Sequence, residues 1–162
     1  MKEYKIIKVD NQSYSMFDDM VFWRMNGRER TYTEKSEATS NKFEDIHLSL
    51  VNPNLYVYSA LDHGKFVGWI SIIYMPRVGS PNCLGHIYVD ELWVELTYRE
   101  QGIANKLMKK ADELLNTTAS AGIRLYVNTE NPNAKILYEK CGFSESGTAY
   151  FMEKDKYYTH AK

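Results

Sequence analysis

One stretch of the sequence decides the fold: Leu92–Ala104, which reads LWVELTYREQGIA. Its first residues close an extended run, residues 86–95, that is typical of a strand. Its last residues open an amphipathic segment, residues 101–116, with apolar residues on one helical face at Ile103, Leu107, Ala111 and Leu114. An alternating run, residues 123–127, follows as a further strand. A strand, a helix and a strand in this order predict a parallel pair.

The chain before this stretch predicts a hairpin and two helices. Residues 55–61 and 65–75 are β-rich runs joined by Asp62-His63-Gly64, which indicates an antiparallel hairpin. Residues 5–9 form a first strand, and helical spacing from residue 15 predicts a helix that ends at Gly27. The polar residues 28–39 are expected to be a loop. A second helix is expected between Asn41 and Pro53.

The chain after this stretch predicts one more helix and two closing strands. A short apolar stripe, residues 134–141, ends at Gly142, which suits a left-handed helix cap. Residues 143–146 and 149–154 are expected to be strands. The fold class is therefore α/β (α+β), with a mixed sheet of about six to seven strands and helices on both faces. Residues 1–162 are expected to form a single domain.

The composition excludes several classes of protein. The 162 residues are 44% hydrophobic and 25% charged, which is a globular balance, and the net charge of -1 gives no whole-chain basic field for nucleic acid or an anionic membrane. Two cysteines and four dispersed histidines do not predict a disulfide scaffold or a metal site. The N-terminus lacks the apolar stretch of a signal peptide, so a soluble cytoplasmic protein is expected.

The turn before residue 103 has the chemistry of a phosphate site. Free N–H groups at a helix start, the positive end of the helix dipole and the missing side chain of Gly102 together suit a phosphate, with Arg99 and Lys106 nearby. The three glycines of a dinucleotide fingerprint and the Gly-Lys-Ser/Thr of a P-loop are both absent. The alternative is an ordinary strand-to-helix turn that happens to contain a glycine.

A second stretch, residues 128–143, reads NTENPNAKILYEKCGF. Together, the two stretches resemble the GNAT family of acyl-CoA N-acyltransferases. Arg99-x-x-Gly102-x-Ala104 is similar to the pyrophosphate motif of that family. The spacing from Asn131 through Tyr138 to Gly142-Phe143 is similar to its second motif. The resemblance covers roughly residues 55–151, and it departs from the family at Glu95-Leu96-Thr97, where an acidic-Pro turn is often found.

The resemblance implies acetyl-CoA as the acyl donor and a sheet that splays apart where the cofactor binds. Backbone groups of residues 92–94 would run beside the pantetheine arm, and N–H groups of residues 99–104 would receive the pyrophosphate. Asn131 would hydrogen-bond the pantetheine end, and Tyr138 would act as general acid beside the sulfur. The cofactor-binding residues it assigns are Leu92, Trp93, Val94, Arg99, Glu100, Gln101, Gly102, Ile103, Ala104 and Asn131.

The chemistry of an amine and a thioester indicates further residues. An attacking amine must lose a proton from an ammonium of pKa about 10.4, and the oxyanion needs a donor such as the Val94 N–H. Asp90 is the expected base, part-buried on the strand face of Tyr88, Leu92 and Val94, with Glu91 on the opposite face; Glu91 or water are alternatives.

Two side chains in the second stretch have a structural alternative. Tyr138 could instead be a core aromatic side chain. Cys141, at a helix end without a histidine partner, is expected to be a core residue rather than a nucleophile.

The sequence therefore predicts an acetyl-CoA-dependent N-acetyltransferase that acts by direct transfer in a ternary complex. The acceptor is a primary amine on a small molecule, a polyamine, an aminoglycoside or a peptide. Asp18-Asp19 and Glu44-Asp45 are either solvated charges or the rim of a site for a cationic acceptor. The alternative function is a catalytically silent acyl-CoA sensor. No nucleic-acid or membrane partner is expected, and a homodimer would be unsurprising because of an exposed strand near the C-terminus.

Overall fold

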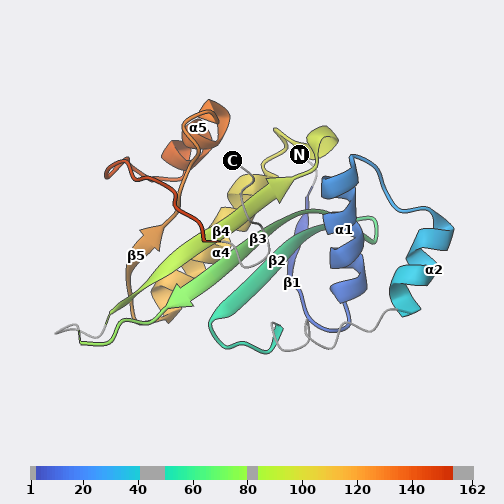
Figure 1. The fold of residues 1–162 in the computed structure, drawn as a ribbon, viewed down its shortest axis with the longest axis horizontal. Helices are drawn as coiled ribbons and strands as arrows, with labels where there is room; N and C mark the ends of the chain where they lie inside the picture. Colours follow the sequence, from blue (N-terminus) through green and yellow to red (C-terminus); the bar gives the residue numbers. More distant parts are fainter. Residues whose placement is uncertain (1–2, 41–49, 80–83, 155–162) are drawn as a thin grey trace. The chain divides into compact units, whose positions relative to one another are not determined.

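The computed structural model describes residues 3–40, 50–79 and 84–154 (Figure 1). The chain divides into two compact units, Met1–Tyr126 and Val127–Lys162. The first unit holds the sheet and helices α1, α2 and α4, and the second holds helix α5. That the whole chain forms a single domain stays a prediction.

The sheet has the mixed topology that the sequence predicts. Its five strands lie in chain order: β1 (Lys5–Lys8), β2 (Leu55–Asp62), β3 (Lys65–Met75), β4 (Gly85–Val94) and β5 (Ser120–Arg124). The first three pairings are antiparallel, and β4 pairs with β5 in parallel across the helix between them. His63 and Gly64 both adopt positive φ, which is what a tight two-residue hairpin turn requires. The fold class is confirmed.

The two closing strands are not formed, so the described chain has five strands rather than six to seven. Residues 143–154 contain no strand in the described structure, and Tyr150 and Phe151 are 97% and 84% exposed. β-propensity becomes structure only where a neighbouring strand supplies hydrogen bonds and packing. Here the prediction rested on residue type alone.

Helices α1 (Tyr14–Asn26) and α4 (Ile103–Thr117) cover opposite faces of the sheet (Figure 1). The ring of Phe17 in α1 lies 5.7 Å from that of Trp69 in β3. On α4, Lys110 lies over the ring of Tyr58, whose strand partner is Ile70, the neighbour of Trp69. Successive residues of a strand point to opposite faces, so the two helices lie on different sides.

Each face of the sheet has its own buried layer. Under α1 the core cluster consists of Val9, Met20, Val57, Phe66 and Trp69. The largest buried side chains elsewhere include Ile70, Ile72, Ile87, Ile103 and Leu107. Gly68 lies in β3 opposite Val94 of β4. A Cβ at this position would stand 2.9 Å from the Trp93 carbonyl oxygen, so glycine permits the close approach of β4.

Helix α2 (Tyr32–Ser40) contradicts the loop expected at residues 28–39. Its start is a capping box: the Glu34 N–H donates to Thr31 Oγ1 at 3.3 Å, and the Thr31 N–H donates to a Glu34 carboxylate oxygen at 2.8 Å. Hydrogen bonds from Arg28 lower the pKa of Glu34 to about 2. The helix has no apolar stripe, and so the cap was its only signal. The helix expected between Asn41 and Pro53 falls largely on residues 41–49, outside the described residues.

Candidate functional site

The parallel pairing of β5 with β4 stops before the second half of β4. β5 pairs with β4 only from Gly85 to Tyr88, whereas β4 continues to Val94. In residues 3–40, 50–79 and 84–154 no strand pairs with β4 on that side beyond Tyr88. Backbone groups of Leu92 and Val94 on this open edge are therefore available for an extended ligand, as expected, whereas those of Trp93 turn toward β3, so the expectation is wrong for Trp93.

The backbone of Val94 points to the open edge. The Glu95 N–H donates to the Val67 carbonyl on β3 at 3.0 Å, so the alternation of the strand turns the N–H and C=O of Val94 to the other side. The Arg99 Nε–H donates to the Val94 carbonyl there at 3.0 Å. Val94 thus presents its N–H at the open edge of β4.

A buried carboxylate shapes the turn that follows. Glu95 is 8% exposed and accepts hydrogen bonds from the Thr97 N–H at 2.7 Å and from the Thr97 hydroxyl. It caps the short 3-10 helix η1 (Leu96–Tyr98). The departure from the family's acidic-Pro turn is therefore compensated, because the Glu95 side chain closes the turn through its own hydrogen bonds.

The start of α4 has the geometry of an anion site. Gly102 precedes the helix with φ +79°, and Glu100 also has a positive φ, of 61°. Gly102 provides no side-chain cap, the first turn holds no acidic residue, and the first helical bond runs from Lys106 to the Gly102 carbonyl. The N–H groups of Ile103 and Ala104 thus have no acceptor within the helix, as at any helix start.

A β-bulge in β4 changes the faces expected for its side chains. Glu91 pairs with Ser71 and Val89 with Ile72, so Asp90 is an extra residue without a partner on β3. Leu92 and Val94 consequently lie on the face of Val89 rather than on the face of Tyr88. The expectation that Asp90, Tyr88, Leu92 and Val94 share one face is wrong, since strict alternation fails at a bulge.

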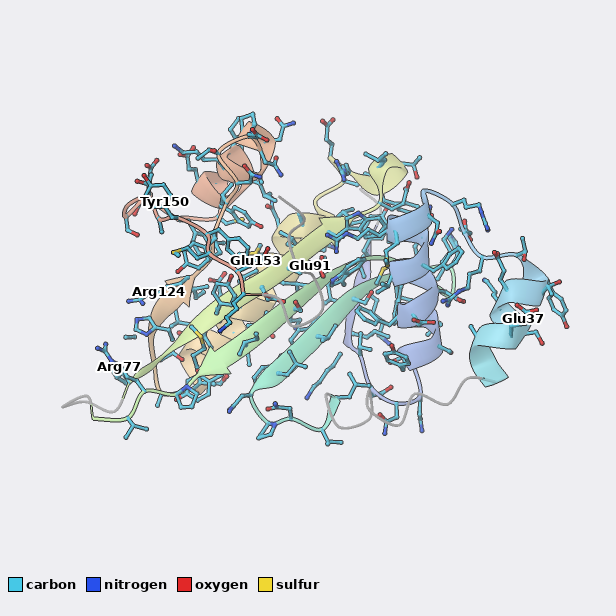
Figure 2. The ribbon with its side chains drawn as sticks, viewed as in Figure 1. Glu37, Arg77, Glu91, Arg124, Tyr150 and Glu153 are labelled. Atoms are coloured by element: carbon cyan, nitrogen blue, oxygen red, sulfur yellow. The ribbon has the colours of Figure 1, made fainter. Side chains whose placement is uncertain are left out.

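The two neighbouring acids have different surroundings. Glu91, which is labelled on β4 in Figure 2, forms an ion pair with Arg24 of α1 and accepts a hydrogen bond from Trp69 Nε1 at 3.3 Å. Asp90 is exposed and accepts a hydrogen bond from the Ser71 hydroxyl at 3.4 Å. Because Ser71 faces Glu91 across the strands, both acids lie on the α1 side. The expectations that Asp90 is part-buried and that the acids face opposite ways are both wrong.

Aromatic rings surround Glu91 and Arg24. The Trp69 and Trp93 rings lie 4.9 Å apart, the Trp23 ring lies 6.3 Å from that of Trp93, and Arg24 lies over Trp69 at 5.2 Å. This wall of tryptophans combines parts from α1, β3 and β4. The sequence indicated Trp93 as a cofactor-binding residue and Trp23 as core or the wall of a substrate cleft, and it did not indicate Trp69.

The acidic rim expected at α1 is neutralised within the protein. Arg30 donates to Asp18 at 2.6 Å and to Asp19 at 2.9 Å, and its side chain is only 13% exposed. These carboxylates are therefore engaged by the chain itself and do not form a free rim for a cationic acceptor. Glu44-Asp45 lies outside the described residues.

In the second unit, Asn131 is the N-cap of α5 (Pro132–Lys140). Its side-chain oxygen accepts from the Ala134 N–H at 3.1 Å, and Pro132 occupies the first helical position. The exposed amide group keeps its two N–H donors on the side away from this cap. A structural role for Asn131 is thus established, and its proposed contact with pantetheine remains untested.

Tyr138 is fixed by the end of the same helix. The Phe143 N–H donates to the Tyr138 carbonyl and the Gly142 N–H to the Glu139 carbonyl, both at 3.0 Å, with Gly142 at φ +88°. This is a Schellman motif, and its usual apolar contact joins the rings of Tyr138 and Phe143 at 6.0 Å. Burial raises the pKa of the Tyr138 phenol above its usual range, and the nearby Cys141 adds to the rise.

The described residues contain neither a cluster of metal ligands nor a membrane-spanning helix. Within the three described ranges there is no group of three or more histidine, cysteine or acidic side chains that could hold a metal ion. No helix in that part of the chain is long and apolar enough to cross a membrane.

In a comparison with known protein families, residues 17–143 match the model of the acetyltransferase (GNAT) family. The acetyltransferase Atu2258 of Agrobacterium fabrum is 39% identical over 64 residues, which are 40% of this chain and 45% of the relative. Streptothricin acetyltransferase of Escherichia coli is 34% identical over 68 residues, which are 42% of this chain and 39% of the relative. The matched segments thus span less than half of both curated relatives.

The fold matches solved acetyltransferase structures over nearly the whole chain. The crystal structure of an aminoglycoside acetyltransferase, meta-AAC0020, from an uncultured soil metagenomic sample superposes with a TM-score of 0.76. The match covers 94% of this chain and 97% of that one at 18% identity. At this identity the similarity establishes the fold alone.

Proposed function

Because this chain belongs to the acetyltransferase (GNAT) family, we propose that it transfers the acetyl group of acetyl-CoA to a primary amine by direct attack in a ternary complex. One observation carries the proposal: the open edge of β4 leads through the Glu95 turn directly to the uncapped start of α4. An extended arm followed by a diphosphate matches that sequence of features.

The cofactor would lie along this edge. The outward N–H of Val94 and the outward C=O of Leu92 would pair with the amides of pantetheine as a further strand would, while the Val94 C=O keeps its contact with Arg99. The pyrophosphate would meet the N–H groups that begin α4 at Ile103 and Ala104, with Arg99 and Lys106 adding positive charge. The exposed N–H₂ of Asn131 would donate to the pantetheine end.

Asp90 is the proposed acceptor of the ammonium proton, through water. Glu91 is held by Arg24 and the Trp69 N–H, and a proton on it would weaken both contacts. Asp90 is exposed, has only the Ser71 hydroxyl as a described partner, and lies on the same side of the sheet. Because the Asp90 carboxylate is open to solvent, a water can lie between it and the amine and relay the proton.

The Leu92 N–H and the Tyr138 phenol would complete the reaction. Val94 lies nearest the pyrophosphate end of the cofactor, so the outward N–H of Leu92, farther along the edge, would stabilise the tetrahedral oxyanion, and the phenol would protonate the departing thiolate. Proton transfer from a phenol of pKa about 10 to a thiolate of pKa about 8.5 is uphill by about 2 kcal/mol. Burial raises the pKa of the Tyr138 phenol and so favours its protonated form, and the capped helix end fixes its ring.

The acceptor belongs to the class of primary amines. The names of the relatives point to streptothricin and aminoglycosides as the first compounds to test. The sensor alternative predicts the same cofactor site without turnover.

A thiol-release assay tests the proposal, with acetyl-CoA against streptothricin, aminoglycosides, polyamines and peptides, and with calorimetric binding of acetyl-CoA in parallel. Binding together with release by one acceptor class supports the enzyme and identifies that class. Binding without release from any acceptor favours the sensor. Absence of binding refutes the cofactor site and with it the proposed function.

A further inference from the structure

The start of the chain contacts the turn that precedes α4. Tyr4, which directly precedes β1, is 3% exposed, and its hydroxyl donates to the side-chain carbonyl of Gln101, 97 residues later in the chain. The ring of Tyr4 meets the ring of Tyr98 edge-on at 6.3 Å. Tyr4 therefore contacts two residues of this turn, one by its hydroxyl and one by its ring.

The Gln101 amide connects Tyr4 to the other end of the turn. Its Nε2–H donates to the Thr97 carbonyl at 2.9 Å. Since a carbonyl oxygen only accepts hydrogen bonds, the N–H₂ group must face Thr97, and the amide oxygen is then left to accept from the Tyr4 hydroxyl. Thr97 is in turn held by the buried carboxylate of Glu95. The chain of contacts runs from Tyr4 to the end of β4.

This turn needs such support. Glu100 adopts φ 61°, a left-handed conformation that costs a residue with a Cβ about 1 kcal/mol or more, and Gly102 adopts another at φ 79°. A strained turn persists only when its surroundings determine its conformation. Gln101, between these two residues, is the point at which Tyr4 holds it.

We propose that Tyr4 is a positioning residue for the pyrophosphate of the acyl donor: through Gln101 it holds the turn in the conformation that aims the N–H groups of Ile103 and Ala104 at the diphosphate. The inference rests on the proposed function, because it assumes acetyl-CoA as the ligand. We call the Tyr4–Gln101 contact the clamp. A turn that is ordered before binding spares the ligand the entropy of ordering it, so loss of the clamp appears as weaker affinity for acetyl-CoA.

Tyr4→Phe is the test, since it removes one hydroxyl and keeps the ring against Tyr98. We expect the Kd and KM for acetyl-CoA to rise about fivefold to tenfold, with kcat within twofold of wild type. Tyr74→Phe is the matched control, because the Tyr74 hydroxyl donates to the Ala119 carbonyl at 3.2 Å, a backbone contact outside the turn. It should leave the Kd unchanged. Urea unfolding of both variants measures any common loss of stability.

A double-mutant cycle tests the route through Gln101. Gln101→Leu removes both amide contacts, so Tyr4→Phe combined with it should weaken binding no further than Gln101→Leu alone. S-acetylpantetheine, which has no pyrophosphate, provides the second readout. Its kcat/KM should be the same for wild type and Tyr4→Phe.

The remaining outcomes distinguish failure of the proposed function from failure of the clamp alone. If the wild-type protein does not bind acetyl-CoA, the proposed function fails and the clamp fails with it. If the wild type binds and Tyr4→Phe binds equally well, the clamp alone is refuted. Equal losses with acetyl-CoA and S-acetylpantetheine, or additive losses in the cycle, would show a general structural role for Tyr4 and also refute the clamp.

Discussion

Replacing Gly102 separates two reasons for a glycine at the start of α4: the backbone conformation and the space in front of the helix. Gly102 has φ 79° and ψ 3°, and a Cβ built there meets no atom of the protein within 4 Å. Gly27, at the end of α1, has φ 67° and ψ 8° with the same empty surroundings. Gly27 is therefore a matched control with the same backbone conformation.

The expected loss of stability is the same at both glycines. A left-handed conformation costs a residue with a Cβ about 1–2 kcal/mol, and the stiffer unfolded chain of the alanine variant offsets about 0.4–1 kcal/mol of it. Gly102→Ala and Gly27→Ala should each destabilise the protein by about 1 kcal/mol. For a domain of this size that is a fall in Tm of about 2–4 °C.

The expected loss of affinity is confined to position 102. The strain of Gly102→Ala is present with and without ligand, so acetyl-CoA affinity falls tenfold at most. Gly102→Glu adds a negative charge in front of the helix start. At about 4–8 Å from a phosphate and an effective dielectric constant of about 20, repulsion is about 2–4 kcal/mol, or about 30- to 1000-fold in Kd. Gly27→Glu should leave the Kd unchanged.

The assay is calorimetric titration with acetyl-CoA, with thermal unfolding of the same four variants. The expected pattern is two similar falls in Tm for the alanine variants and a Kd that rises steeply only for Gly102→Glu. If folded Gly102→Glu bound acetyl-CoA as tightly as wild type, the pyrophosphate could not lie at the start of α4. Equal losses of affinity in both glutamate variants would refute the argument as well.

Four further substitutions test the chemistry and the fold. Tyr138→Phe removes the proposed proton donor, so kcat should fall at least tenfold. Because the ring contact with Phe143 is kept, the stability should not change. Because burial raises the pKa of Tyr138, wild-type kcat should not decline on the alkaline side below about pH 10. Asp90→Asn should lower kcat/KM about 100-fold at pH 7, and the pH profile should show this deficit shrinking toward pH 10, where the amine deprotonates unaided. Glu91→Gln should lower kcat/KM less. Thr31→Ala removes the α2 cap, so hydrogen exchange in that helix should quicken about fivefold while core amides are unaffected.

The sequence predicted the elements whose conformation depends on residues close together in the chain. The hairpin of β2 and β3, the parallel pair around α4, the helix end at Gly27 and the left-handed Gly142 were all predicted, because each depends on a few neighbouring residues. Helix α2 was missed because its residues lack an apolar stripe. Its Thr31–Glu34 capping box was a readable signal that could have identified it.

Contacts between distant segments could not be predicted in this way. The hydrogen bond from Tyr4 to Gln101 spans 97 residues, and neither residue type indicates the other. The same holds for Arg24 and Glu91, whose ion pair joins α1 to β4. The closing strands fail for the opposite reason: their residue types favour β structure, but a strand also requires a partner.

The bulge at Asp90 had a signal in the sequence, and its position explains how two adjacent acids acquire different properties. Apolar residues stand at 87 and 89 and again at 92 and 94, so the alternation shifts phase across one acidic pair. A regular strand would have turned one pair away from the α4 face. The extra residue lets both pairs stay there, and it leaves Asp90 outside the ladder while Glu91 remains in register with Ser71. The Asp90 carboxylate is exposed to solvent and hydrogen-bonds to the Ser71 hydroxyl, whereas the Glu91 carboxylate is held by an arginine and a tryptophan. This argument, rather than strand parity, favours Asp90 as the base.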